Sequence, residues 1–132
     1  MDNIWNYKID IIDESVFDKL ETILGRPVPS NLREFVIMAN GSNPEHNLIN
    51  INGVERVFET VLSFNEAEED AVTVFQMIDG QNDKSLIPFG LDPFGNVFCY
   101  SLDSNTVVFF EYEEDTFVDS EYSLSEFVSE LY

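Results

Sequence analysis

Three apolar runs rich in β-branched and aromatic residues constrain the fold more than any other feature of the sequence. They cover residues 86–90, 97–102 and 106–112, and each has the length of a strand. The segments 92–96 and 103–105 separate them with Asp, Pro, Gly, Ser and Asn, the residues that favour turns. Because such short connections join antiparallel neighbours, the pattern predicts an antiparallel meander.

Two helices are predicted ahead of this meander. Apolar residues recur at helical spacing over residues 13–24, and Asp13 or Ser15 can cap the start of that segment. A second apolar face follows over residues 29–40, with a proline in the first turn and Asn-Gly at the end. The N-terminal part of the chain is therefore predicted to be helical.

Three further elements complete the prediction. Residues 48–64 form a hairpin, because Asn52 and Gly53 make the dipeptide favoured in two-residue turns. Residues 66–79 carry both helical and strand signals, and the acidic start favours a helix. A last helix begins at Ser123, where Glu126 completes a capping box. The prediction is an α+β fold, a mainly antiparallel central sheet with helices at both chain ends packed on it, in one domain over residues 1–132.

Charge restricts the partners of such a domain. The chain has 26 Asp and Glu against 6 Lys and Arg, which gives a net charge of −20 at pH 7. A surface this acidic repels nucleic acid and anionic lipid, so neither is expected as a partner. It suits a basic partner, although acidity of this kind also serves solubility alone.

The cellular location is predicted from three features of the sequence. No signal peptide is recognised near the start, and no segment reaches the roughly 18 apolar residues of a membrane span. The one cysteine, Cys99, has no partner for an internal disulfide. A cytoplasmic protein is expected.

The sequence offers little for catalysis or metal binding. His46 is the one histidine and lies in a polar segment, where an exposed structural role is expected. Cys99 stands inside a predicted strand, where cysteines are usually buried and inert. Residues 79–83 carry oxygen ligands but lack the spacing of a calcium loop. No catalytic residue, metal site or cofactor is predicted.

A series of local motifs runs along the chain in a fixed order. They are Val28-Pro29, Leu32-Arg33-Glu34-Phe35, Asn40-Gly41, Leu62-Ser63-Phe64-Asn65, Ile87-Pro88-Phe89-Gly90, Asp92-Pro93-Phe94-Gly95-Asn96, Val97-Phe98-Cys99-Tyr100, Val107-Val108-Phe109-Phe110 and Ser125-Glu126-Phe127. This series resembles the SUKH superfamily, which includes a yeast cell-wall-synthesis regulator and many bacterial toxin-immunity proteins. The resemblance covers nearly the whole chain and depends on the order of the motifs rather than on any one of them. At Tyr112-Glu113 the sequence departs from the His-Glu pair that is common in the family.

The resemblance implies a non-catalytic immunity protein that binds and neutralises a cognate toxin, often a nuclease. Together with the charge, it predicts a positively charged nuclease domain as the partner. The competing hypothesis is a general intracellular interaction or regulatory module, like the yeast member, that has no toxin partner.

Three acidic groups are the candidate partner-binding residues. The second and third groups are expected to share one rim of the sheet, where aromatic side chains can act as anchors. Solvated faces and core packing are the alternatives for these residues. The acidic groups are Glu66, Glu68, Glu69 and Asp70; Glu111, Glu113, Glu114 and Asp115; and Asp119 and Glu121; the aromatic candidates are Phe94, Tyr112, Phe117 and Tyr122.

Overall fold

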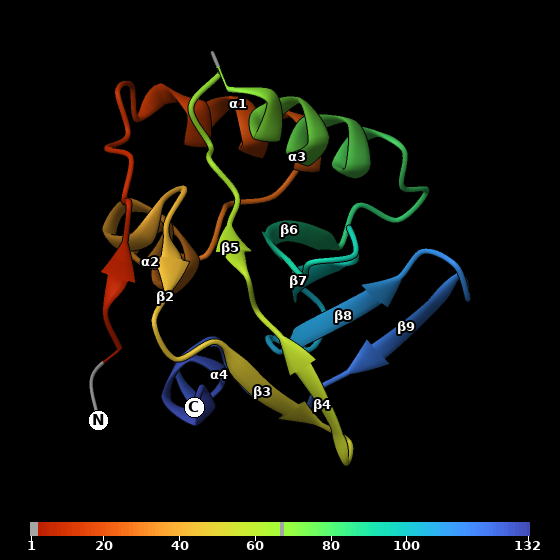
Figure 1. Cartoon of the computed structure of the whole chain (residues 1–132). Coiled ribbons are helices and arrows are strands. Elements are labelled where there is room, and N and C mark those ends of the chain that lie inside the picture. Colours follow the sequence, from red (N-terminus) through yellow and green to blue (C-terminus); the bar gives the residue numbers. More distant parts are fainter. Residues whose placement is uncertain (1–2, 67) are drawn as a thin grey trace.

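The computed structural model describes residues 3–66 and 68–132, and its helices and antiparallel sheets confirm the α+β fold class (Figure 1). Residues 1–2 of the predicted domain and residue 67 of the predicted helix 66–79 lie outside the described residues. The elements in chain order are β1 (Trp5–Asn6), α1 (Ser15–Leu24), α2 (Ser30–Ala39), β2 (Asn43–Pro44), β3 (Leu48–Ile51), β4 (Val54–Val57), β5 (Thr60–Val61), α3 (Glu69–Asp79), β6 (Leu86–Leu91), β7 (Val97–Ser101), β8 (Val107–Glu111), β9 (Thr116–Asp119) and α4 (Leu124–Glu130).

The largest sheet has five strands in the order β5-β6-β7-β8-β9, and every neighbouring pair is antiparallel. The predicted meander forms its centre as β6, β7 and β8. Phe98 lies opposite Phe109 in the β7–β8 ladder, and Phe110 lies opposite Phe117 in the β8–β9 ladder. Consecutive hairpins therefore build the C-terminal half of the molecule.

Local sequence signals explain where several elements begin and turn. Asn52 and Gly53 have φ values of 52° and 84°, as the predicted two-residue turn between β3 and β4 requires. The Ser123 hydroxyl accepts a hydrogen bond from the Glu126 N–H, and the Glu126 carboxylate accepts one from the Ser123 N–H. The N-cap of α1 is Glu14, whose side chain makes no capping hydrogen bond. Of the two predicted capping residues, Asp13 supplies an acceptor: its carboxylate, one residue before the N-cap, accepts the Ser15 N–H at 2.9 Å. That hydrogen bond lowers the pKa of Asp13.

Phenylalanine side chains from distant elements fill the centre of the core. Phe58 packs against Phe89, Phe98 and Phe127, with ring centroids 5.9, 5.0 and 5.4 Å apart, and all four are fully buried. A Cβ at Gly90 would lie 2.3 Å from the Phe58 ring, so this strand position requires glycine. The core thus joins the loop before β5, strands β6 and β7, and α4.

The sequence prediction missed four short strands. β1 and β2 form a separate two-stranded sheet, and β5 is a two-residue edge of the large sheet, although its residues were assigned to the 48–64 hairpin. No element was predicted between residue 112 and the last helix, but β9 lies there and pairs with β8 along its whole length. Strands of two to four residues carry too little alternation to stand out, and their neighbours decide their pairing.

Candidate protein-binding surface

The β8–β9 hairpin forms one edge of the large sheet and lies at the right of the molecule in Figure 1. Glu111 pairs with Thr116, and residues 112–115 make the turn between them. The Asp115 N–H donates to the Tyr112 carbonyl at 3.3 Å, and Asp115 has a φ of 49°. This left-handed conformation suits Asp better than most residues, so the sequence favours a tight turn here.

Carboxylates crowd the turn of this hairpin. Glu111 is mostly buried and forms an ion pair with Arg56 of β4 at 2.7 Å, while the guanidinium lies 4.9 Å from the centre of the Phe109 ring. Glu113, Glu114 and Asp115 are exposed and form no ion pair with any described Lys or Arg. The turn therefore presents three negative charges that no basic side chain offsets.

Two partly exposed aromatic rings flank these carboxylates. Phe117 stacks on Phe110 with ring centroids 4.5 Å apart, and Tyr112 meets the same ring edge-on at 4.7 Å. Phe117 is 55% exposed and Tyr112 is 51% exposed, so more than half of each residue remains accessible to solvent. The hairpin thus combines apolar area with charge on one small surface.

A chain of hydrogen bonds fixes the position of this turn. The buried Asp92 carboxylate accepts the N–H groups of Phe94 and Asn96, at 2.9 and 2.8 Å. The Asn96 side-chain oxygen accepts the Tyr112 N–H at 3.1 Å, which links the β6–β7 turn to the β8–β9 turn. Phe94 projects from the first turn and is 86% exposed. We define the acidic hairpin as residues 110–117 together with the supporting 92–96 turn.

Comparison with known families adds a finding that covers this surface. The model of the SMI1 / KNR4 family (SUKH-1) matches residues 11–130. The chain belongs to this family. The SUKH resemblance indicated by the motifs is thereby confirmed, and the match includes the whole acidic hairpin. Comparison with curated proteins found no match.

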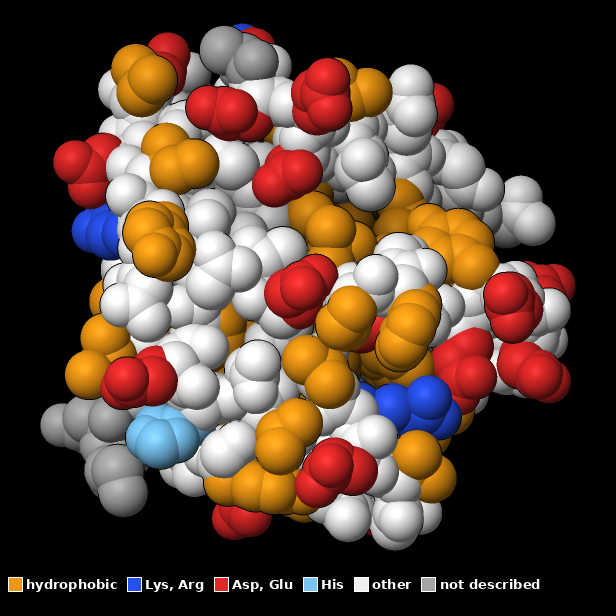
Figure 2. All heavy atoms as spheres, in the orientation of Figure 1, with side chains coloured by type: hydrophobic (Ala, Val, Ile, Leu, Met, Phe, Trp, Pro, Cys, Tyr) orange, Lys and Arg blue, Asp and Glu red, His pale blue; other side chains and the backbone are white. Residues whose placement is uncertain are grey.

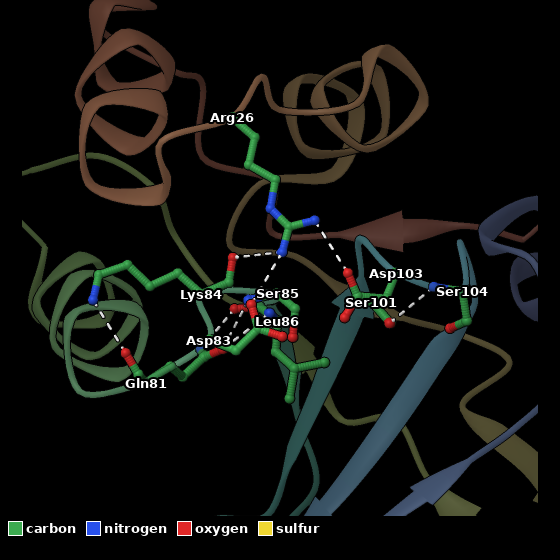
Figure 3. Close-up of polar contacts among 9 residues, drawn as sticks. All are labelled: Arg26, Gln81, Asp83, Lys84, Ser85, Leu86, Ser101, Asp103 and Ser104. Carbon is green, nitrogen blue, oxygen red and sulfur yellow. Dashed lines mark hydrogen bonds and ion pairs between the residues drawn. The ribbon is translucent and has the colours of Figure 1, made fainter.

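In this SUKH-1 chain the basic side chains are occupied by intramolecular contacts. Figure 3 shows Arg26 reaching between Asp83 and Asp103, with N–O distances of 3.4 and 3.1 Å, and so joining the loop after α1 to two loops of the sheet. Lys84 donates to the carbonyls of Asp79 and Gln81 at the end of α3. The remaining four also contact carboxylates: Lys8 with Asp10, Lys19 with Glu66, Arg33 with Glu14, and Arg56 with Glu111.

The first acidic group lies apart from the hairpin. Glu69 begins α3, whereas Met77, about 12 Å further along that helix, receives the contact from the Tyr112 hydroxyl. Glu66 pairs with Lys19, and the Asp70 carboxylate accepts the Ser63 N–H at 2.9 Å. Glu68 and Glu69 are exposed. Glu66 and Asp70 make contacts near the start of α3, and the group as a whole does not join the acidic hairpin.

The third acidic group follows β9. Asp119 lies about 10 Å along that strand from the turn, and its carboxylate accepts the Glu121 N–H at 2.8 Å. The backbone carbonyl of Asp119 accepts the Asn52 side chain from the β3–β4 turn. Tyr122 is half-buried against the core. The structure therefore brings together Glu113, Glu114 and Asp115 with Tyr112 and Phe117, while Asp119 and Glu121 lie at the other end of β9.

The distribution of charge on the visible face agrees with this arrangement. In Figure 2, Asp and Glu side chains are scattered over the surface and gather most densely at the right, over the β8–β9 turn. Hydrophobic side chains occupy much of the space between them.

Cys99 and His46, the two side chains considered for catalysis, lie in surroundings that favour a structural role. Cys99 is fully buried in β7, and burial raises the pKa of its thiol far above the ordinary value, which disfavours the reactive thiolate. His46 is half-buried in the β2–β3 loop, where its backbone exchanges two hydrogen bonds with the Asn3 side chain. Among residues 3–66 and 68–132, no three His, Cys, Asp or Glu side chains converge as a metal ion requires.

A helix that crosses a membrane must be long and apolar, and the helices of the described residues do not meet both conditions.

Sequence reasoning missed the support of the hairpin. The Asp-Pro-Phe-Gly-Asn segment was recognised as a turn, and its Asp at the first position is the signal for the carboxylate-to-backbone bonds that Asp92 makes. The bond from Tyr112 to Asn96 spans 16 residues and depends on the β7–β8 register. The pairing of Arg56 with Glu111 spans 55 residues, and no local pattern encodes it.

Proposed function

We propose that this SUKH-1 protein is a non-catalytic immunity protein that binds a cognate toxin, a positively charged nuclease domain, through the acidic hairpin. One observation carries the proposal: three carboxylates without an ion-pair partner and two half-exposed aromatic rings lie together on the acidic hairpin, whose turn is hydrogen-bonded to the 92–96 turn. Family membership supports an immunity role, since toxin neutralisation is what the SUKH resemblance implies.

The negative charge of the hairpin favours association with a basic partner. A nuclease binds the phosphate backbone through a groove of Lys and Arg, and a cluster of carboxylates complements that groove. The whole chain, at −20, extends the attraction beyond the contact surface and raises the association rate. Because salt screens such forces, association slows as ionic strength rises.

The aromatic rings serve affinity. Partly exposed Tyr and Phe side chains offer large apolar area with few rotatable bonds, as residues that dominate binding energy commonly do. Phe117 and Tyr112 are already ordered by Phe110, so binding a partner costs them little conformational freedom. The toxin is then inhibited stoichiometrically, by covering its active site or an adjacent surface, with no turnover.

The alternative is a general interaction or regulatory module without a toxin. The same hairpin would then bind a basic host protein. Gene neighbourhood separates the two functions, because an immunity gene lies beside the gene of its toxin.

The test is protection of cells that express the toxin domain encoded beside this gene. We expect the wild-type protein to restore growth and to co-purify with the toxin. The variant E113Q/E114Q/D115N should lose protection and slow association at low salt. The matched control D18N/E68Q/E69Q removes the same charge from α1 and from the start of α3, and it should protect like the wild type. An equal loss of protection in both variants would show that only the net charge matters and would contradict the role of the hairpin. Nuclease or other catalytic turnover by the protein alone would contradict the proposal as a whole.

A further inference from the structure

The outer edge of β9 is open to a further strand. Among the described residues, 3–66 and 68–132, β9 ends the five-stranded sheet and pairs only with β8. Figure 1 shows it at the lower right, with β8 along one side. Thr116, Phe117 and Asp119 are exposed, so solvent reaches this strand along most of its length. An exposed strand edge carries backbone donors and acceptors with which another chain can pair.

The register of β9 determines which backbone groups this edge offers. The Ser120 N–H donates to the Val107 carbonyl at 3.0 Å, so the backbone of Ser120 faces β8. The backbone groups of successive residues in an antiparallel strand face alternate sides. Val118 therefore also faces β8, whereas Phe117 and Asp119 face outward.

Three backbone groups remain free on the outer edge. The Asp119 carbonyl accepts the Asn52 side chain at 3.2 Å, which agrees with its outward direction and closes that end of the edge. The Phe117 N–H, the Phe117 carbonyl and the Asp119 N–H have no hydrogen-bond partner within the part of the chain that the structure describes. An extended segment lying along β9 can bond to all three.

Carboxylates flank both ends of the same edge. Residues 113–121 contain five of them, Glu113, Glu114, Asp115, Asp119 and Glu121, and no Lys or Arg. All five are exposed, and none forms an ion pair with a described Lys or Arg. The two groups lie about 10 Å apart, which is the length of β9. A strand docked on this edge therefore meets negative charge at both of its ends.

This charge decides which kind of segment fits the edge. A second copy of the chain would bring its own five carboxylates against these five and be repelled. An uncharged segment would partly remove the carboxylates from water without replacing their hydrogen bonds to it. Lys and Arg side chains instead gain attraction from both groups. The edge thus suits an extended basic segment.

The Phe117 ring specifies the middle of that segment. Phe117 and Asp119 are two residues apart, so their side chains lie on the same face of the sheet. A residue opposite Phe117 would place its side chain beside a ring that is 55% exposed and already stacked on Phe110. An apolar residue fits this position. Lys or Arg two residues away on each side would then lie near Asp119 at one end and near residues 113–115 at the other.

We infer that the outer edge of β9 binds an extended basic segment of the toxin, which joins the five-stranded sheet as a sixth strand. The segment alternates basic and apolar side chains on one face, in the order basic, apolar, basic. The inference rests on the proposed function and extends it from the acidic hairpin along β9 to Asp119 and Glu121. Backbone pairing supplies affinity, and the flanking carboxylates select the basic sequence.

A synthetic peptide tests the edge in the absence of the toxin. The peptide has seven residues and blocked ends, with Val at the centre, Lys two positions away on each side, and Ser and Thr elsewhere. The Phe117 and Asp119 amide protons should exchange rapidly in the free chain, because both face solvent. Once the peptide concentration exceeds its Kd about tenfold, NMR should show both protons exchanging about tenfold more slowly.

Two methylated peptides of equal charge separate strand pairing from simple attraction. N-methylation of the central Val removes the N–H that would face β9, and it should weaken binding about tenfold. N-methylation of the neighbouring residue, whose N–H would face away from β9, is the matched control. The control peptide should bind like the unmodified one.

A protein variant tests the same edge with the toxin domain encoded beside this gene. D119N/E121Q removes the two carboxylates furthest from the acidic hairpin, and its affinity for the toxin should fall about fivefold at low salt. The control D18N/E68Q removes the same charge from α1 and from the residue before α3, and it should bind like the wild type.

Three results overturn the inference. These are unchanged exchange of the Phe117 and Asp119 amide protons in the presence of the peptide, equal binding of the two methylated peptides, and equal toxin affinity of D119N/E121Q and its control. If E113Q/E114Q/D115N still loses protection in that case, the acidic hairpin binds the toxin without an added strand. Slowed exchange with the peptide, but no binding of the toxin, would contradict the proposed function and retain the edge as a site for basic segments.

Discussion

The core and the acidic hairpin contain the same kind of aromatic cluster with opposite exposure. In the core, Phe58 meets Phe98 and Phe127 at 5.0 and 5.4 Å, and all three rings are fully buried. In the hairpin, Phe110 meets Tyr112 and Phe117 at 4.7 and 4.5 Å, yet half or more of the last two residues remains exposed. Both regions therefore contain ring–ring contacts, but only in the core is the whole apolar area of the rings buried by folding.

The largest effect should come from the centre of the core. Phe58→Ala removes a fully buried ring that contacts Phe89, Phe98 and Phe127, and the cavity cannot close because the strands around it are fixed. The free energy of unfolding should fall by about 3–5 kcal/mol. Urea unfolding followed by circular dichroism measures it, and a loss below about 1 kcal/mol would show that the two regions differ less than their exposure indicates.

Phe117→Ala tests whether the hairpin rings contribute to binding rather than to folding. Its half-exposed ring should contribute less than about 1 kcal/mol to folding but about 2 kcal/mol to binding of the toxin domain, a loss of roughly thirtyfold in affinity. Isothermal titration calorimetry and urea unfolding on the same sample separate the two quantities. Unchanged affinity together with a large loss of stability would make this ring part of the core.

The Arg56–Glu111 pair joins the two regions and should have a smaller effect. Arg56 contacts Glu111 on one side and the Phe109 ring on the other, and both charged side chains are about three-quarters buried. Arg56→Met should lower the free energy of unfolding by about 1–2 kcal/mol, since Glu111 loses its partner in a partly desolvated site. D10N breaks the more exposed Lys8–Asp10 contact and should change stability by less than about 0.5 kcal/mol.

Apart from the D10N control, the smallest effect concerns the helix that carries Phe127 into the core. Ser123→Ala removes the capping hydroxyl of α4 and should lower the free energy of unfolding by about 1 kcal/mol.

The hydrogen bond from the Ser123 N–H lowers the pKa of Glu126, so this carboxylate stabilises the fold above its unfolded pKa near 4.5. That contribution disappears as pH falls through the folded pKa.

Comparison of the wild type with Glu126→Gln tests the sign of this effect. Thermal unfolding should show the wild type to be more stable at neutral pH, and the difference should shrink as pH falls below 4.5 and through the lowered folded pKa of Glu126. A difference that grows on acidification would contradict the assigned cause.

Most of the fold follows from local patterns. The turn at Asn52 and Gly53, the capping box at Ser123 and the turn at 92–96 all lie where the residues predict them. β9 was missed because Thr116–Asp119 is short and flanked by acidic residues, and its strand conformation depends on the free edge of β8.

The candidate surface was predictable in composition but not in arrangement. The sequence indicated that acidic and aromatic residues gather over residues 110–117, yet Phe109 and Phe110 are adjacent and chemically identical, and only the strand pairing makes the first buried and the second part of the hairpin. The grouping of Glu113, Glu114 and Asp115 and the separation of Glu69 from them likewise depend on tertiary contacts.

The link from Asp92 through Asn96 to Tyr112 affects how a partner would be released. Because two turns from different strand pairs are bonded to each other, neither can deform without disturbing the other. A complex formed on this surface would have to lose most of its contacts in one step instead of detaching turn by turn. Long residence times, with affinity set mainly by the dissociation rate, are the behaviour expected of an inhibitor that must not let its target escape.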